Sequence, residues 1–434
     1  MKRFTVFLLS ILVAATAPIW AQTIQLTYLH GFTGPDGPVM DKLIAAFNQT
    51  HPGIQVQGQP VPWGNLFSQL EPSVAAGKAA DVVAVNEDVV VGFILRGALT
   101  ELTPAMMSSA QIASSRFYPS LWGVGNVNGK QYGVPVHFVM LVMYWNKDLF
   151  TKAGLDPNKP PATRAEFLAD ARALTTDTSG RHPADAGFDA ANLATWGLGV
   201  PTPWMGGTIA YAVAAQNGVT FVGDKASGYK ANFNSPGGRD AFQFLVDLVQ
   251  KEHVSPANAT EQSEIDAFRA GKVGMNFNGV WMLDQYKGQS GLNFGVAGFP
   301  NLGTGAYRDW AGGSFLALPK QKKVDAKRQA AALTFINWLT LADQDLAWTS
   351  AGSLPTQPAV TAATPYAMNP MSVLKPSLPG AYIIPGFPFI SDFRAAWDAA
   401  FEAAILGKKD VATALSDGAV ESDKRVAEAL KSLP

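Results

Sequence analysis

The stretch from Gly129 to Gly154 constrains the fold more than any other part of the chain. Its middle, from Val136 to Trp145, is almost continuously apolar, too short to cross a bilayer and too uniform to be half exposed. Asn146 can cap a short helix that follows, and Gly154 can end that helix in a left-handed conformation. A buried strand that leads directly into a capped helix is typical of an α/β sheet.

Length and composition limit the class of protein. With 434 residues the chain is too long for one ordinary core, so two domains of about 150 to 200 residues are expected. The net charge is −1, charged residues make up 15% of the chain, and no basic run can follow a phosphate backbone, so nucleic acid is not an expected partner. Eleven Trp and ten Tyr exceed what a core requires, which indicates that some of these rings face a ligand.

The N-terminus has the pattern of a cleavable secretory signal. Two basic residues precede an apolar segment from Phe4 to Ala17, and the small residue Ala21 precedes Gln22. We expect residues 1–21 to be removed and the product to be soluble and periplasmic or otherwise extracytoplasmic; the alternative is an uncleaved N-terminal anchor. The absence of cysteine excludes disulfides, thiolate metal sites and a lipid-modified N-terminal cysteine.

The first part of the chain alternates between strand and helix patterns. The patterns predict a strand at Thr23–Tyr28, a helix through Met40–Phe47, a strand at Ile54–Gln57, a helix at Asn65–Ala76 and a strand at Asp81–Val85. This alternation predicts a mainly parallel sheet with right-handed crossovers, whose ligand-binding groups lie in the loops beyond the strand ends.

Four side chains in these loops are candidate ligand contacts: His30, Phe32, Trp63 and Glu87. The Trp63 ring can cover a ligand or close as a hydrophobic lid over the following helix. Glu87 can accept hydrogen bonds from a ligand, or it can be a solvated carboxylate at the start of a helix.

The remainder of the chain adds further elements. A capping box from Thr163 to Glu166 begins a helix that reaches about Leu174, and a polar surface loop is expected at residues 175–192. Further helices are predicted at residues 209–217, 238–252, 261–270, 327–341, 392–406 and 411–433, with strands after residue 194, after residue 271 and at residues 292–299. A Pro-rich, poorly periodic stretch is expected from residue 354 to residue 388.

A second group of candidates lies in these later segments. Trp204 lies between Pro203 and two glycines, and its ring either stacks on a ligand or holds the loop in place. The Trp281 ring either faces a cleft or packs under a helix. Arg394 falls in the first turn of a helix, where a cation is expected only if an anion or carboxylate faces it. The alternative for Arg394 is a solvated pair with Asp392 or Asp398.

The glycine-rich segment from Gly303 to Gly313 contains Asp309 and Trp310. It has neither the phosphate-loop spacing nor the dinucleotide-binding glycine fingerprint. The segment is better explained as a crossing between domains where the backbone approaches a ligand closely. The five histidines have no metal-ligand spacing, and we expect no metal, no cofactor and no catalytic residue.

Six segments together resemble a known family. They are MDKLIAAFNQTHPGIQV; AAGKAADVVAV with LRGALTEL; GKQYGVPV with YWNKDLFTKAGLDPNKPPATRAEF; FRAGKVGMNFNGVW; AGGSFLALPKQKKVDAKRQAAALTFINWLT; and AGSLPT, which follows the fifth as its continuation. From about Ile24 to Leu415 the chain resembles the extracellular solute-binding proteins of carbohydrate-type ABC importers, the maltose-binding-protein-like group. The resemblance implies an α/β, two-lobed (type II) periplasmic-binding-protein fold with a ligand cleft between the lobes and multiple crossovers.

The implied lobes are residues 22–135 with 312–345, and residues 136–311 with 346–434. The crossings fall near Val134 to Val136, near Ala311 to Ser314 and after Leu341.

Within the family, the chain also resembles the glycerol-3-phosphate-binding members. Four positions match ligand-lining positions there: an aromatic at Trp63, a glutamate at Glu87, a glycine at Gly313 and a phosphate-facing arginine at Arg394. Val139 and Gly279 instead stand where those members have ligand-binding serines, and Ser353 where they have a tyrosine. An unpaired buried polar group costs about 1 to 3 kcal/mol, so a neutral sugar or polyol fits at least as well as a glycerol phosphate.

The resemblance implies capture rather than catalysis. A ring can cover the C–H face of a sugar while Glu87, His30 and Asp309 accept its hydroxyl protons. The expected partners are a sugar, polyol or glycerol phosphate and the transmembrane subunits of an ABC permease, and we expect a monomer. The rival hypothesis is a secreted carbohydrate hydrolase with Glu87 and Asp309 on either side of a glycosidic bond.

Overall fold

The computed structural model describes residues 23–224, 226–383, 387 and 389–431. The predicted signal peptide at residues 1–21 and the predicted end of the last helix at Leu433 lie outside these residues. Within the described ranges, every helix is too short or too polar to span a bilayer.

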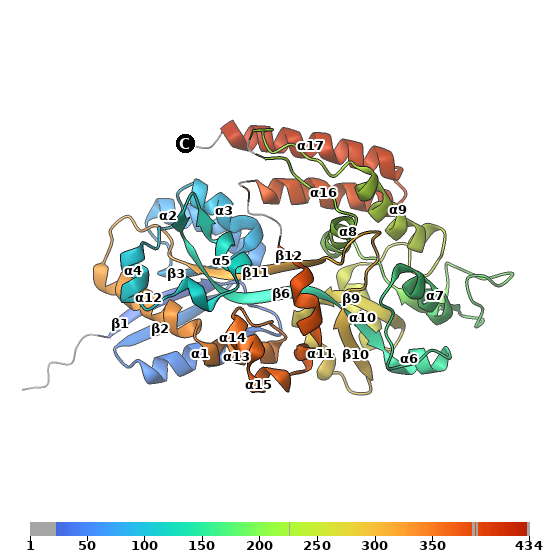
Figure 1. Ribbon diagram of the computed structural model, residues 1–434, viewed down its shortest axis with the longest axis horizontal. Coiled ribbons are helices and arrows are strands. Elements are labelled where there is room, and N and C mark those ends of the chain that lie inside the picture. The colour runs from blue at the N-terminus through green and yellow to red at the C-terminus, as the bar shows by residue number, and fades with distance from the viewer. Residues whose placement is uncertain (1–22, 225, 384–386, 388, 432–434) are drawn as a thin grey trace, which may run out of the picture.

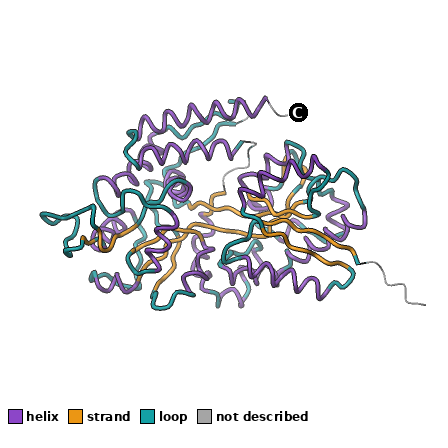
Figure 2. Tube along the Cα trace, turned by 180° about the vertical axis from the view of Figure 1, so that it is seen from behind, coloured by secondary structure: helices purple, strands orange, loops and turns teal. Residues whose placement is uncertain are grey.

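One mixed sheet runs along the molecule, with helices on both sides (Figures 1 and 2). Its order is β2-β1-β3-β11-β6-β9-β8-β7, with β10 beside β6 and β12 beside β11. The strands are β1 (Ile24–His30), β2 (Ile54–Pro60), β3 (Val82–Asn86), β6 (Gly133–Asn146), β7 (Thr176–Asp177), β8 (Leu193–Leu198), β9 (Val273–Gly279), β10 (Phe294–Gly298), β11 (Asp309–Ala317) and β12 (Ala381–Ile383). A small separate hairpin joins β4 (Asn126–Val127) and β5 (Lys130–Gln131).

The prediction of a mainly parallel sheet holds for β1, β2 and β3 but is wrong for the middle of the sheet. There β11 runs antiparallel to both β3 and β6, and β6 runs antiparallel to β9 and β10. The reason is that β6 carries the chain from the first half of the molecule to the second and β11 carries it back, so the two strands run in opposite directions.

The central apolar run is a fully buried strand, as predicted. β6 has 14 residues and all of them are buried. It pairs with β11 from Gly133 to Met140, and with β9 and β10 from there to Asn146. The Asn146 side chain accepts hydrogen bonds from two backbone N–H groups of α6 (Lys147–Lys152), and Gly154 beyond it has a φ of 75°.

The predicted long helices are present, with ends shifted by a few residues. The helices are α1 (Gly37–Thr50), α2 (Trp63–Ala76), α3 (Glu87–Leu95), α4 (Pro104–Ser109), α5 (Pro119–Val124), α7 (Arg164–Leu174), α8 (Trp204–Gln216), α9 (Pro236–Gln250), α10 (Glu261–Arg269), α11 (Leu283–Lys287), α12 (Ala326–Leu339), α13 (Ala342–Trp348), α14 (Pro358–Ala362), α15 (Thr364–Ala367), α16 (Ile390–Ile405) and α17 (Val411–Lys431). The predicted capping box of α7 is confirmed. The short helices α13 to α15 were not predicted, because they are too short to show a helical period.

The apolar side chains form a core in each half of the molecule. Tyr28 and Phe335 belong to the core around β1, α1 and α12, whereas Tyr144 and Trp397 belong to the core around β6, α8, α9 and α16. Along β6, Val136 contacts the first core and the residues from Phe138 onward contact the second. We call these halves the first and the second lobe; their exact residue boundaries remain a prediction.

The helices α16 and α17 lie against each other and cover α8 and α9 of the second lobe (Figure 1). The N-terminal part of α16 also reaches across to α3 of the first lobe. The last helices therefore bring C-terminal residues close to a helix formed some 300 positions earlier in the chain.

Candidate ligand-binding site

A cavity of about 440 Å³ lies between the two lobes. Its first-lobe wall comes from the loop after β1 and from the first turns of α2 and α3. Its second-lobe wall comes from the first turns of α8, α10 and α16 and from the turn after β9, while β6 and β11 contribute the residues between the lobes. This volume suits a small ligand enclosed by both lobes.

Three tryptophans form the aromatic part of the second-lobe wall. Trp204 begins α8, Trp281 lies in the turn after β9, and Trp310 is the second residue of β11. Their ring centroids are 6.2 Å apart for Trp204 and Trp281, 6.3 Å for Trp204 and Trp310, and 6.3 Å for Trp281 and Trp310. On the first lobe Trp63 also lines the cavity and contacts Phe32 and Phe67.

Glycines make room for two of these rings. A Cβ atom at Gly279 would collide with the ring of Trp281, and one at Gly31 would collide with the ring of Trp63. The absence of a side chain at Gly279 therefore leaves the space that the Trp281 ring occupies.

Glu87, the first residue of α3, is a buried polar group of the first lobe. Its Oε2 accepts a hydrogen bond of 2.9 Å from the backbone N–H of Gly313 on β11. Burial, and then the charge of neighbouring Asp88, raise the pKa of the Glu87 carboxyl to about 8. The alternative of a solvated carboxylate is therefore wrong, and burial favours the neutral form of the Glu87 carboxyl, which can both donate and accept hydrogen bonds.

Arg394 is the main cation of the second-lobe wall and is only 8% exposed. Its Nη2 donates a hydrogen bond of 2.8 Å to Oγ1 of Thr208 and lies 3.4 Å from Oδ1 of Asp398, one helical turn further along α16. The predicted pairing with Asp398 is present, but it is buried rather than solvated. Burial raises the pKa of Asp398 to about 6, and the charge of Arg394 opposes that rise.

The structure brings most of the predicted site residues together in this cavity. Its lining includes Trp63, Glu87, Trp204, Trp281, Trp310, Gly313 and Arg394. Trp63 and Trp204 are the first residues of α2 and α8, not loop residues as expected.

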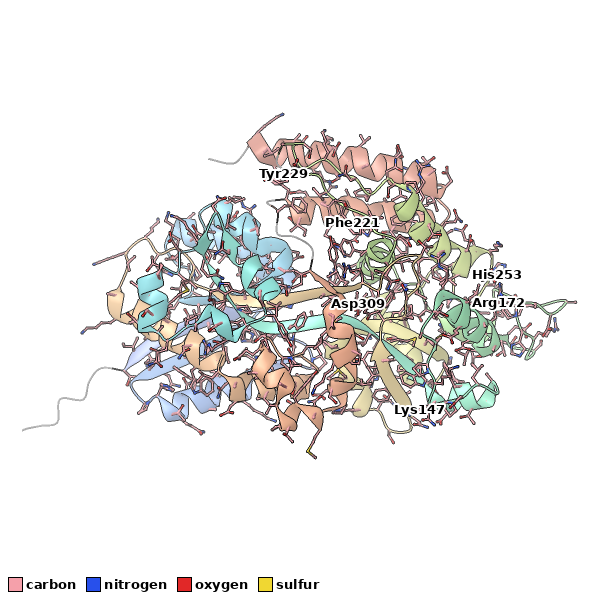
Figure 3. All side chains as sticks on the ribbon, viewed as in Figure 1. Lys147, Arg172, Phe221, Tyr229, His253 and Asp309 are labelled. Carbon is pink, nitrogen blue, oxygen red and sulfur yellow. The ribbon has the colours of Figure 1, made fainter. Side chains whose placement is uncertain are left out.

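The structure does not bring His30, Phe32 and Asp309 to the cavity lining. β1 continues to His30, and both rings pack inside the first lobe, where Phe32 contacts His30 and Trp348. Asp309 opens β11 in the middle of the molecule (Figure 3) and is completely buried; the hydroxyl of Tyr307 donates to its Oδ2 at 3.5 Å.

Sequence reasoning missed several lining residues. Asp88, His137 and Glu261 all reach the cavity. Asp88 lies next to Glu87, just beyond the end of β3, so the strand-end signal that singled out Glu87 could have found it too. Glu261 begins α10, and His137 lies inside an apolar run that gave no such signal. Burial raises the pKa of Glu261, and it lowers that of His137 to about 4, so the His137 ring is neutral at neutral pH.

In the part of the chain that the structure describes, no three side chains of His, Asp or Glu lie close enough together to hold a metal ion.

Comparison with known sequences shows relatives along most of the chain. Residues 33–345 match the family described as bacterial extracellular solute-binding protein. A protein of Brucella abortus (strain 2308) named as a binding protein is 26% identical over 400 residues, 90% of this chain and 90% of that protein. The sn-glycerol-3-phosphate-binding periplasmic protein of the same strain is 26% identical over 295 residues, 65% of this chain and 62% of that protein.

Comparison with solved structures shows the fold. The maltose/maltodextrin-binding domain of Bdellovibrio bacteriovorus, bound to maltotriose, matches with a TM-score of 0.78 and 20% identity, over 93% of this chain and all of that one. The GacH receptor of Streptomyces glaucescens, solved without ligand and with acarbose, matches with a TM-score of 0.78 and 22% identity, over 95% of this chain and all of that one. These likenesses confirm the predicted two-lobed α/β fold class.

Proposed function

The chain belongs to the family of bacterial extracellular solute-binding proteins, and from this premise we propose that it captures a sugar or polyol outside the cytoplasm and delivers it to the permease of an ABC importer. The observation that carries the proposal is the cavity between the lobes, with a tryptophan wall on one lobe and buried acids on the other. Tryptophan faces suit the C–H surfaces of a sugar, and the acids of the first lobe suit its hydroxyls.

Closure of the lobes is the proposed working motion. Because both lobes line the cavity, a ligand that contacts both walls binds the closed form more tightly than an open one. We place the hinge near Val134 to Val136 and near Ala311 to Ser314, where β6 and β11 lie side by side between the lobes. The closed form would then be the one that the permease recognises.

The relatives support two ligand classes. Solved neighbours carry maltotriose and acarbose, which favours a neutral or amino sugar. The sn-glycerol-3-phosphate-binding relatives favour a phosphate ester facing Arg394. Both classes fit the general proposal of capture.

The hydrolase hypothesis receives no support from the geometry. Its two carboxylates do not share one space, because Glu87 lines the cavity whereas Asp309 is completely buried and does not. We propose that the protein binds without catalysis. Release of reducing sugar during prolonged incubation with maltotriose would contradict this.

A thermal-shift screen tests the proposal. Maltotriose, mannobiose, tagatose, acarbose, glycerol and sn-glycerol-3-phosphate are each added to the protein. A ligand that binds only the native state raises the melting temperature, by the equivalent of about 3 kcal/mol at a hundredfold excess over its Kd. We expect at least one of these compounds to do so, and a flat response to all of them would contradict the proposal.

A further inference from the structure

Two oppositely charged side chains reach the cavity from opposite lobes, and each leaves one atom without a partner. Nη1 of Arg394 on α16 and Oδ1 of Asp88 on α3 are both buried and have no hydrogen-bond partner. Buried polar atoms in proteins are almost always hydrogen-bonded. An unpaired buried donor and an unpaired buried acceptor on residues that line one cavity therefore indicate that a ligand group binds to both.

The two side chains line the same cavity but do not form an ion pair with each other. The ion pair of Arg394 is with Asp398, on its own helix. Burial raises the pKa of Asp88 while the charge of Arg394 lowers it, so the two groups interact through space. The helices that carry them, α3 and α16, contact each other across the two lobes, and both side chains line one cavity, so a single ligand can reach both.

The chemistry of the two free atoms selects the group that fits. A phosphate offers only acceptors once ionised, so it would satisfy Arg394 and repel Asp88. An ammonium offers only donors and would repel Arg394. A hydroxyl both donates and accepts, and two neighbouring hydroxyls can accept from Nη1 of Arg394 with one oxygen and donate to Oδ1 of Asp88 with the other.

The surrounding charges favour the same choice. Asp398 already balances part of the charge of Arg394, and the acids Asp36, Glu87 and Glu261 share the cavity wall. Burial raises the pKa of all three lining acids, so their ionised forms are already costly. An ionised phosphate would be desolvated in the same space, where Arg394 is the one cation among the lining residues and is already partly balanced by Asp398.

We propose that Arg394 and Asp88 form one subsite that binds adjacent hydroxyls of an uncharged sugar or polyol and discriminates against its phosphate esters. This subsite rests on the proposed function, because it names the ligand class of the same cavity. Since Arg394 belongs to the second lobe and Asp88 to the first, the bound diol also joins the two lobes.

Calorimetric titration of the whole protein tests the subsite. The probes are maltotriose, mannobiose and glycerol, with sn-glycerol-3-phosphate as the charged probe. We expect the best neutral probe to bind and sn-glycerol-3-phosphate to bind at least about tenfold more weakly. Arg394→Lys, which keeps the charge beside Asp398, and Asp88→Asn should each weaken the neutral probe by about tenfold or more. The double variant should lose less than the sum of the two single losses, because both residues bind the same diol.

Matched controls are Arg425→Lys on α17, whose ion pair is with Glu421, and Asp343→Asn, exposed in the first turn of α13. Both should bind like the wild type, and melting curves identify any variant that fails to fold. Tighter binding of sn-glycerol-3-phosphate than of every neutral probe would overturn the subsite while leaving capture intact, and so would folded variants of unchanged affinity. Absence of binding by every probe would contradict both proposals.

Discussion

Two tryptophans of the cavity, Trp63 and Trp281, each occupy space that a single glycine leaves open. Neither Gly31 nor Gly279 has a positive φ, so these glycines are needed for space and not for backbone conformation. The glycine at position 279 thus has a structural reason, which is the ring of Trp281. The sequence alone shows the glycine but not the ring for which it leaves space.

Gly279→Ala should disturb the aromatic wall. The added methyl group collides with the Trp281 ring, so we expect a loss of stability of about 1 to 3 kcal/mol and weaker sugar binding. Urea denaturation and titration with the best neutral sugar measure the two effects. Gly123→Ala is the control, because a Cβ atom there meets no other atom within 4 Å. Equal behaviour of the two variants would refute the packing argument.

His30 should make stability depend on pH. Both of its ring nitrogens are buried without a partner, and burial lowers its pKa to about 4, although the charge of Asp41 opposes the shift. Between pH 6.5 and pH 4 the folded state therefore binds fewer protons at this residue than the unfolded state, and stability falls as the pH decreases through that window.

The variant His30→Leu should remove this contribution. From pH 7 to pH 5, we expect the free energy of unfolding of the wild type to fall by about 2 kcal/mol more than that of His30→Leu. Urea denaturation at each pH measures the difference, and His182→Gln, at an exposed histidine, should follow the wild type. Parallel curves for His30→Leu and the wild type would show that His30 titrates normally.

At the scale of elements, strands and helices with a uniform hydrophobic pattern were predictable from the sequence. Close contacts between residues of different elements were not. β6 was predictable because an apolar run of its length has few other uses. β11 was expected as a glycine-rich crossing, yet it is a buried strand from Asp309 to Ala317. Its glycines are there because a Cβ at Gly312 would collide with Glu87, and one at Gly313 would crowd the carbonyl of His137 on β6. Such contacts depend on residues far apart in the sequence.

The capping box of α7 permits a test at this scale. Thr163 accepts a hydrogen bond from the backbone N–H of Glu166, and Glu166 accepts one from the backbone N–H of Thr163. Thr163→Ala should lower the free energy of unfolding by about 1 kcal/mol. Thr163→Ser should retain most of the stabilisation that the cap provides, because its hydroxyl can accept the same hydrogen bond. Ligand affinity should not change, because α7 does not line the cavity. A loss of affinity in Thr163→Ala at full folding would contradict this separation.

At the scale of the whole molecule, the site exists only because distant segments meet. Glu87, Trp204 and Arg394 could be singled out from the sequence for three different reasons. Glu87 follows a predicted strand, Trp204 lies between a proline and two glycines, and Arg394 falls in the first turn of a helix. The sequence could not show that Arg394 and Asp88 line the same cavity. About 300 residues separate them, and they meet only because α16 of the second lobe contacts α3 of the first. In the function that we propose, the same arrangement couples closure of the lobes to ligand binding.

Small-angle X-ray scattering tests this central claim most directly. The protein is measured alone and saturated with the neutral sugar that stabilises it most, and the Arg394→Lys variant is measured at the same sugar concentration. We predict that the radius of gyration of the wild type decreases on saturation and that the variant, at a concentration too low to saturate it, changes less. An unchanged scattering curve for the fully saturated wild type would contradict capture by closure of the lobes.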